Sequence, residues 1–214
     1  MPANPPSTEP EAASTRSRAF DMVAIGGSAG GIDVLNILLA ALPEGFNPAV
    51  TIVLHLPPAP PSYLVQTFGY RSVLPVVEPD AGERILAGRV YVAPPGYHML
   101  IEDDGTIALS TEAAVRFSRP SIDVLMESAA WVYRERLLGI LLSGANEDGV
   151  RGLETVRAMG GATWVQAPGS AASPEMPRAA IERGAADEVL IPTTMARRLA
   201  RLPASTTTHP ESMP

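Results

Sequence analysis

Two hydrophobic patterns alternate along most of the chain. Short continuous apolar runs, several of them rich in Val, Ile and Leu, predict strands that are buried on both faces. Between them, apolar residues that recur at spacings of three and four predict amphipathic helices. The predicted strands are residues 21–26, 49–55, 73–78, 88–94, 98–103, 106–110, 137–144, 162–166 and 188–192. The predicted helices are residues 29–42, 62–70, 120–133, 149–159, 177–183 and 194–202.

This alternation predicts an α/β fold, a doubly wound, mostly parallel sheet with helices on both faces, in three α/β/α layers. Residues 73–110 have the pattern of a meander, which predicts some antiparallel strands at one edge of the sheet. Residues 1–19 and 203–214 are rich in Pro, Ser and Thr without periodicity, so they are predicted to be disordered tails. One domain, residues 20–202, lies between them.

Composition narrows the functional classes. The 214 residues carry a net charge of −7, which argues against nucleic acid or an anionic membrane as the main partner. No apolar run reaches the length of a membrane span, and the N-terminal segment lacks the apolar core of a signal peptide. We therefore predict a cytoplasmic protein without membrane insertion. The absence of cysteine excludes disulfides, thiolate metal sites and a cysteine nucleophile, and we predict neither a metal nor a cofactor.

Three predicted strands lead to side chains that carry out hydrolytic chemistry in other proteins. Ligands of doubly wound sheets bind beyond the carboxyl ends of the strands. The first strand leads into GGSAGG, which contains Ser28, and the second ends at His55. Residues 137–144 lead through ANEDG to Asp148. A serine, a histidine and an aspartate are the parts of a hydrolytic triad: the nucleophile, the general base and the acid that orients the imidazole.

The residues that flank these three side chains favour this interpretation. Glycines on both sides of Ser28 permit a sharp turn from strand to helix, and GGSAG fits the G-x-S-x-G pattern of an exposed nucleophile. The N-terminus of the following helix favours a nearby oxyanion. His55 precedes Leu-Pro-Pro, so its strand must stop there, and Asp148 lies between a buried strand and a helix.

Each of these residues also has a simpler interpretation. A glycine-rich turn is typical of a phosphate site, although a dinucleotide fingerprint would need glycine at Ser28 and no P-loop lysine follows. A lone histidine such as His55 is commonly bonded to backbone, and His98 and His209 are the other candidate bases. Asp148 is also typical of a helix N-cap. The sequence order of Ser28, His55 and Asp148 differs from that of α/β-hydrolases, which run serine, acid, histidine.

Other conspicuous polar and aromatic residues are predicted to be structural. Asp33 and Asp123 have the positions of capping or solvent-facing residues in the first turns of predicted helices. Trp131 and Trp164 are predicted to belong to the core.

Six separated motifs resemble the catalytic domain of the CheB-type protein-glutamate methylesterases of bacterial chemotaxis. The motifs are AIGGSAGG, VLHLPP, GERILAGRVYVAPPGYHMLI, RFSRPSIDVLMESAA, LLSGANEDGVRG and EMPRAA, and the resemblance covers nearly all of residues 21–202. It implies that Ser28 is the nucleophile, His55 the base and Asp148 the triad acid. It also implies that the backbone amide of Ala145 binds the oxyanion.

The resemblance implies a substrate as well. Enzymes of this family hydrolyse γ-glutamyl methyl esters on the cytoplasmic helices of methyl-accepting chemoreceptors, and some also deamidate glutamines there. The expected function is therefore a serine hydrolase with chemoreceptor helices as partners. The alternative is a catalytically inactive binding module of the same fold in a receptor signalling array, and a nucleotide-binding protein is a weaker third possibility.

The chain departs from the family pattern at three places. Ala29 follows the serine where the family often has Thr, and Glu147 adds a negative charge beside Asp148, which we expect to favour protonated His55 and shift activity to higher pH. The first predicted strand begins at residue 21, which leaves too little of the given sequence for the ~100 residues of a preceding receiver domain, so the sequence is either a part of a longer protein or a stand-alone member of the family. The expectation is a stand-alone enzyme, with a receiver-domain protein as a possible partner in trans.

Overall fold

The structure is a computed structural model that describes residues 18–55 and 63–203. The predicted tails therefore lie outside the described residues, except for residues 18, 19 and 203 next to the domain. The main strands are β1 (Met22–Gly27), β2 (Ala49–Leu54), β3 (Val76–Val77), β4 (Val90–Val92), β7 (Leu137–Leu141), β8 (Ala162–Gln166) and β9 (Glu188–Leu190), with β5 (His98–Ile101) and β6 (Ile107–Ser110) apart. The helices are α1 (Gly31–Ala40), α2 (Leu64–Gly69), α3 (Ile122–Tyr133), α4 (Val150–Ala158), α5 (Glu175–Glu182) and α6 (Pro192–Leu199), with short 3-10 turns η2 (Arg134–Arg136) and η3 (Pro168–Ser170).

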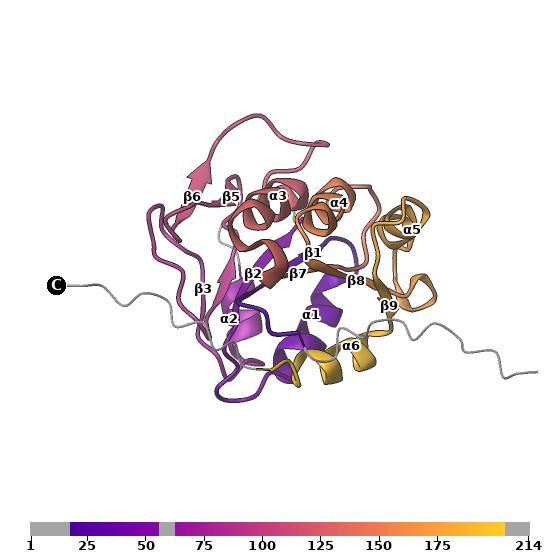
Figure 1. Cartoon of the computed structure of the whole chain (residues 1–214), viewed down its shortest axis with the longest axis horizontal. Helices are drawn as coiled ribbons and strands as arrows, with labels where there is room; N and C mark the ends of the chain where they lie inside the picture. Colours follow the sequence, from indigo (N-terminus) through magenta and orange to yellow (C-terminus); the bar gives the residue numbers. More distant parts are fainter. Residues whose placement is uncertain (1–17, 56–62, 204–214) are drawn as a thin grey trace, which may run out of the picture.

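The main sheet has seven strands in the order β3-β4-β2-β1-β7-β8-β9, and every neighbouring pair is parallel. β1 lies at the centre between β2 and β7, so the strand order reverses beside it. Helices cover both faces: α3, α4 and α5 lie on one face, and α1, α2 and α6 lie on the other (Figure 1). The predicted three-layer α/β/α fold with a mostly parallel sheet is confirmed.

The antiparallel strands are present, but they are not at an edge of the main sheet. β5 and β6 form a separate two-stranded hairpin beside α3, joined through a turn at Asp103–Gly105 (Figure 1). β3 and β4 instead join the main sheet in parallel. Residues 78–89 carry the chain back from the end of β3 to the start of β4, and such a crossover produces parallel neighbours. The predicted meander over residues 73–110 is wrong for its first half.

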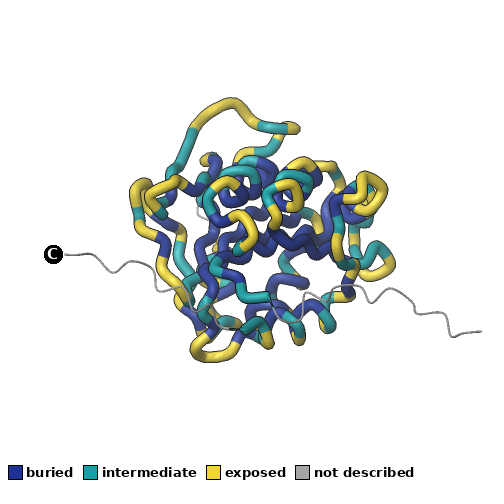
Figure 2. The backbone as a smooth tube through the Cα atoms, in the orientation of Figure 1, coloured by how far each residue is buried: buried dark blue, intermediate teal, exposed yellow. Residues whose placement is uncertain are grey.

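Two apolar cores lie on the two faces of the sheet. Side chains of β1 alternate between them: Val23 and Ile25 pack on the side of α1 and α6, and Met22 and Ala24 pack on the side of α3 and α4. The central strands are therefore buried along their whole length, as Figure 2 shows in dark blue, which explains their uninterrupted apolar sequences. Trp164 belongs to the core as predicted, whereas Trp131 is 60% exposed on α3.

The parallel sheet determines where the candidate residues meet. The carboxyl ends of all seven strands lie at one edge, and β2, β1 and β7 are neighbours there. Ser28 follows β1, His55 follows β2, and residues 142–149 follow β7. No helix in the described ranges 18–55 and 63–203 has the length and apolar character needed to cross a membrane.

Candidate active site

Ser28 begins the sharp turn between β1 and α1. Its amide donates to the carbonyl of Ser143 (2.9 Å), and its own carbonyl accepts from the amide of Gly31 (2.8 Å). Gly30, the N-cap residue of α1, has a φ of 79°, which favours glycine because it lies in the left-handed region. The hydroxyl of Ser28 forms no hydrogen bond with any residue that the structure describes, and the residue is partly exposed.

Gly144 allows the loop after β7 to approach this serine. A Cβ atom at position 144 would lie 3.1 Å from the Cβ of Ser28 and would collide with the side chain of Met176. The backbone of Gly144 is fixed on both sides, because its amide donates to Ser173 (2.9 Å) and its carbonyl accepts from Met176 (2.9 Å). The loop that carries Asp148 is therefore packed directly against the predicted nucleophile.

His55 lies beside Ser28 on the neighbouring strand. Gly27 of β1 pairs with Leu54 of β2, and the amide of His55 donates to the carbonyl of Gly27 (3.1 Å), so Ser28 and His55 are the next residues of two adjacent parallel strands. The imidazole Nε2 is 2.7 Å from Oδ2 of Asp148. Nδ1 is buried and has no hydrogen-bond partner among the described residues. The structure forms the His–Asp bond of the predicted triad, but it contains no hydrogen bond between Ser28 and His55.

Asp148 is fully buried at the N-terminus of α3. Besides the bond to His55, its carboxylate accepts hydrogen bonds from the hydroxyl of Ser121 (2.8 Å) and from the amides of Ile122 (2.7 Å) and Asp123 (3.1 Å). Ser121 is the N-cap residue of α3. The carboxylate therefore fills the anion-binding position at a helix N-terminus, in agreement with the preference of such positions for negative charge.

These contacts keep Asp148 ionised. Burial on its own raises the pKa of this carboxyl, but the hydrogen bonds from His55, Ile122 and Asp123 outweigh burial, and the net result is a pKa below its usual range. An ionised Asp148 favours the imidazole tautomer with its proton on Nε2. The lone pair of neutral His55 is then on Nδ1, the nitrogen that is without a partner.

Asp123 forms the complementary contact at the start of α4. Its Oδ1 accepts from the amides of Gly149 (2.8 Å) and Gly152 (2.8 Å), so Asp123 of α3 caps α4 while Asp148 caps α3. The predicted capping role of Asp123 is correct, although the residue is buried. Burial first, and then the charge of Asp148, raise the pKa of Asp123 to about 6, against the opposing effect of the two amides.

His98, the competing candidate base, is a buried structural residue. Its Nδ1 accepts from the amide of Ser121 (3.2 Å), and its Nε2 is 3.2 Å from the carbonyl of Ala113. Both ring nitrogens are thus used by backbone, and the ring supports Ser121, which in turn bonds to Asp148. The third candidate, His209, lies outside the described residues.

Glu147 has a different environment from the one that the sequence suggested. Its side chain is 54% exposed and lies 3.3 Å from the guanidinium of Arg116. Arg116 also approaches Asp123, at 3.9 Å. Because this pairing offsets the charge of Glu147, we expect Glu147 to have only a small effect on His55.

Two backbone amides near the serine donate to no other residue that the structure describes. Ala145, predicted to bind the oxyanion, is exposed, and its N–H donates to no other described residue. The same holds for the N–H of Ala29, the residue after Ser28. An amide directly after the nucleophile is a frequent oxyanion donor. The G-x-S-x-G pattern could therefore have predicted this role for Ala29, although the alanine side chain gives no sign of it.

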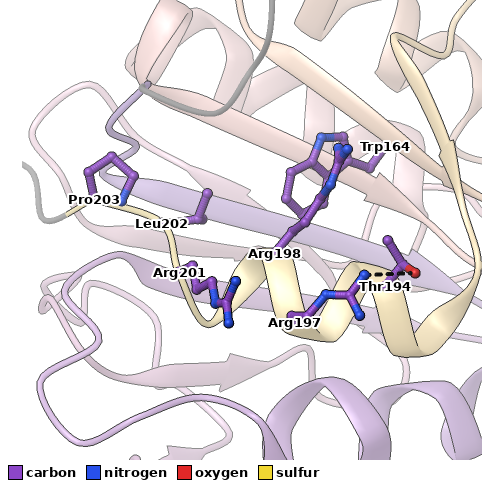
Figure 3. Close-up of a pocket in the computed structure, with 7 residues that line it drawn as sticks. All are labelled: Trp164, Thr194, Arg197, Arg198, Arg201, Leu202 and Pro203. Carbon is purple, nitrogen blue, oxygen red and sulfur yellow. Dashed lines mark hydrogen bonds between the residues drawn. The ribbon is translucent and has the colours of Figure 1, made fainter.

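The mouth of the site is a pocket of about 440 Å³ beside His55. The other residues that line it are Gly96, Ala114, Phe117, Ser118, Arg119 and Pro120. A second pocket, of about 520 Å³, lies along α6 and is shown in Figure 3. It is lined by Trp164, Thr194, Arg197, Arg198, Arg201, Leu202 and Pro203, and it contains none of the predicted site residues. Across residues 18–55 and 63–203, no cluster of three His, Cys, Asp or Glu residues has an arrangement suited to a metal ion.

Known proteins resemble the chain in sequence and in fold. A candidate protein-glutamate methylesterase/protein-glutamine glutaminase of Leptospira interrogans is 40% identical over 183 residues, which are 86% of this chain and 95% of the relative. A protein-glutamate methylesterase/protein-glutamine glutaminase of Symbiobacterium thermophilum is 40% identical over 169 residues, which are 79% of this chain and 47% of the relative.

The fold comparison agrees with the sequence comparison. The crystal structure of the Thermotoga maritima CheB methylesterase catalytic domain superposes with a TM-score of 0.82 at 29% identity, and the match covers 86% of this chain and 99% of that chain. The sequence pattern of the family described as CheB methylesterase matches residues 23–199, which include the strand ends that carry Ser28, His55 and Asp148. The chain therefore belongs to the CheB methylesterase family.

Proposed function

We propose that the chain hydrolyses γ-methyl esters of protein-bound glutamate with Ser28 as nucleophile, His55 as base and Asp148 as the orienting acid. Family membership makes the chain a protein-glutamate methylesterase, and the names of its relatives add glutaminase activity. The single observation that carries the assignment of residues is the 2.7 Å bond between His55 and the buried Asp148, one strand away from the unbonded hydroxyl of Ser28.

The first step is acylation. Nδ1 of His55 takes the proton of the Ser28 hydroxyl while Oγ forms a bond to the ester carbonyl carbon. Ionised Asp148 stabilises the imidazolium that forms and keeps its ring oriented, because the carboxylate is itself held by the start of α3. The tetrahedral intermediate then loses its methoxy group, and His55 returns the proton so that methanol leaves.

The negative charge of the intermediate needs donors that are already in place. The amides of Ala29, which follows Ser28, and of Ala145, which follows the residue packed against Ser28, are the proposed donors, since they donate to no other described residue. The N-terminus of α1 adds a favourable dipole. Both donors are backbone groups, so alanine at these two positions is compatible with the role.

Deacylation repeats the same transfers with water. His55 takes a proton from a water molecule, the resulting nucleophile attacks the acyl-serine, and the bond between Ser28 Oγ and the carbonyl carbon breaks. Ser28 recovers its proton from His55, and the product is the free glutamate side chain. With glutamine as the substrate, the same sequence releases ammonia in place of methanol.

The proposed substrate is the cytoplasmic helical region of a methyl-accepting chemoreceptor, and the proposed location is the cytoplasm. This choice rests on family membership, and a receiver-domain protein acting in trans stays a prediction. A binding module without catalysis is the competing function, but the His55–Asp148 bond and the unused amides of Ala29 and Ala145 have no role in such a module.

The test is methanol release from a methylated chemoreceptor cytoplasmic fragment. Wild-type protein is expected to release methanol and Ser28→Ala is expected to release none above background. Ser72→Ala is the matched control, because Ser72 lies beyond the C-terminus of α2 and its hydroxyl accepts only from the nearby backbone amide of Leu74 among the described residues. Release that persists in Ser28→Ala would remove the assignment, and a wild type without release would favour the binding module.

A further inference from the structure

The segment between β6 and α3 forms a projecting arm, residues 111–119. It arches away from the body of the molecule above β5, β6 and α3, and most of it is exposed (Figures 1 and 2). At its tip, Val115 and Ser118 exchange two backbone hydrogen bonds of 3.1 and 2.8 Å, which close a two-residue turn. The two central residues of this turn are Arg116 and Phe117.

This turn has an unfavourable sequence for its shape. Arg116 has a φ of 47° and Phe117 a φ of 65°, so both occupy the left-handed region. Turns with two positive φ values strongly prefer Asn-Gly or Asp-Gly, because a bulky side chain is strained there. Such strain persists only where the surrounding contacts determine the backbone, and it is concentrated at ligand-binding sites.

The arm does have contacts that hold it in this shape. The guanidinium of Arg119 donates to the carbonyls of Thr111 (2.7 Å) and Glu112 (2.9 Å), which ties the two ends of the arm together. Nε2 of His98 lies 3.2 Å from the carbonyl of Ala113, and Arg116 pairs with Glu147 of the loop that carries Asp148. These contacts hold the base of the arm and connect its tip to the loop that carries Asp148.

Phe117 gains nothing from this arrangement within the molecule. Its side chain is fully exposed, with a relative accessibility of 104%, so it contributes no buried apolar surface to the fold. Yet it lines the same 440 Å³ pocket as His55. A strained backbone that presents an unburied aromatic ring beside the candidate base is not explained by folding, whereas a partner that covers the ring would explain both features.

We propose that Phe117 is the docking residue for the protein substrate, and that its ring packs between apolar side chains of the helix that carries the esterified glutamate. The inference rests on the proposed function. An aromatic anchor that is rigidly presented loses little conformational entropy on binding, which suits a substrate that is a protein surface and not a small ester. Phe117 is thus a specificity-determining residue that contacts the substrate outside the reacting bond.

The experiment compares a protein ester with a small ester. Methanol release from a methylated chemoreceptor cytoplasmic fragment and hydrolysis of p-nitrophenyl acetate are measured for wild type, Phe117→Ala, Phe117→Tyr and Trp131→Ala. Phe117→Ala is expected to raise KM for the receptor fragment about tenfold with little change in kcat, and to lower the ratio of protein-ester to small-ester kcat/KM by the same factor. Phe117→Tyr is expected to recover most of the loss.

Trp131→Ala is the matched control, because this exposed aromatic residue is near the other end of α3 from the site. It is expected to leave both activities at the wild-type level. A further variant, Phe117→Gly, relieves the backbone strain at position 117. It is expected to raise the Tm and also to raise KM for the receptor fragment. A destabilised Phe117→Gly protein would indicate a structural role and overturn the inference.

The outcomes separate the inference from the function on which it rests. An unchanged KM in Phe117→Ala, or an equal loss on both esters, overturns the docking role while the proposed function stands. Absence of Ser28-dependent hydrolysis of either ester in the wild type overturns the proposed function itself.

Discussion

The two sides of the candidate active site differ in whether their polar groups have hydrogen-bond partners within the protein. On one side, Asp148 receives hydrogen bonds from His55, Ser121, Ile122 and Asp123. On the other side, the hydroxyl of Ser28 and the amides of Ala29 and Ala145 have no partner in the described part of the chain. Buried polar groups are normally bonded within the protein, and groups left without partners at a surface edge are available to a ligand.

This contrast separates the groups that hold the site together from the groups that are available to a substrate. The carboxylate side is part of the fold, because it closes the start of a helix. The serine side is organised by the backbone around it and not by bonds to its own reactive atoms. Changes on the serine side are therefore expected to affect activity alone, while changes on the carboxylate side are expected to affect both activity and stability.

The largest expected effect is the loss of the proposed nucleophile, Ser28, or of the proposed base, His55. Ser28→Ala and His55→Ala are each expected to lower kcat for ester hydrolysis by about 10⁴-fold or more, and the double variant is expected to be no slower, because the two groups act as a unit. Ser28→Ala is expected to change the free energy of unfolding by less than about 0.5 kcal/mol, since its hydroxyl has no partner among the described residues. Single-turnover kinetics measure the rate of ester hydrolysis, and urea titrations measure the free energy of unfolding. Additive losses of rate in the double variant would contradict the proposed triad.

Asp148→Asn tests the bonded side. The amide group of asparagine has one accepting oxygen in place of two, so at least one of the four donors is left unsatisfied in a buried position. We expect kcat to fall by about 10³–10⁴-fold and the free energy of unfolding to fall by about 2–4 kcal/mol.

The matched control for Asp148→Asn is Asp33→Asn, an exposed aspartate in the first turn of α1. It is expected to cost less than about 1 kcal/mol and to leave ester hydrolysis intact. A fully stable Asp148→Asn protein would show that the cap of α3 does not depend on the carboxylate.

Asp123→Asn tests the difference between the two buried carboxylates, because the pKa of Asp123 is raised and the pKa of Asp148 is lowered. Because the pKa of Asp123 is raised to about 6, this group stabilises the fold fully below about pH 4, and that contribution is lost as the pH rises through 6. Asparagine does not titrate and keeps an accepting oxygen for Gly149 and Gly152. The variant is therefore expected to gain about 2–3 kcal/mol relative to wild type between pH 4 and pH 7. Urea titrations across this range would contradict the raised pKa if the two stability curves ran parallel.

The smallest effect is expected for Glu147→Gln. The sequence suggested that Glu147 shifts activity to higher pH, but its exposed carboxylate pairs with Arg116. Exposed pairs have small, screened effects, so the pH–rate profile of the variant is expected to be displaced only slightly from that of the wild type. A larger displacement at low ionic strength would restore the original hypothesis.

Much of the fold followed from the sequence because the hydrophobic patterns reflect burial directly. Continuous apolar strands predicted a parallel sheet covered on both faces, and the convergence of parallel strand ends brought His55 close to Asp148 although 93 positions separate them. The edge strands were harder. β3 has only two residues, and whether it pairs in parallel or antiparallel depends on the path of residues 78–89, for which no local pattern exists.

The supporting residues of the site could not be predicted for a related reason. Ser121 and His98 reach Asp148 through a chain of hydrogen bonds that spans segments 23 and 27 positions apart. A serine before a helix predicts an N-cap, but nothing local indicates that it also donates to a distant carboxylate. The pairing of Glu147 with Arg116 was missed because charge at one position says nothing about its neighbour in space.

The crossed caps of α3 and α4 have a consequence for how the enzyme loses activity. The first turn of α4 is closed by Asp123 of α3, and the first turn of α3 is closed by Asp148 of the loop that leads into α4, so neither start can fray without exposing amides of both. The four amides are thus expected to exchange with solvent deuterium as one cooperative unit, whose opening also releases His55. Heat or denaturant would then displace the proposed base, His55, and loosen the helix pair in the same event, so we expect no partly opened form that still turns over substrate.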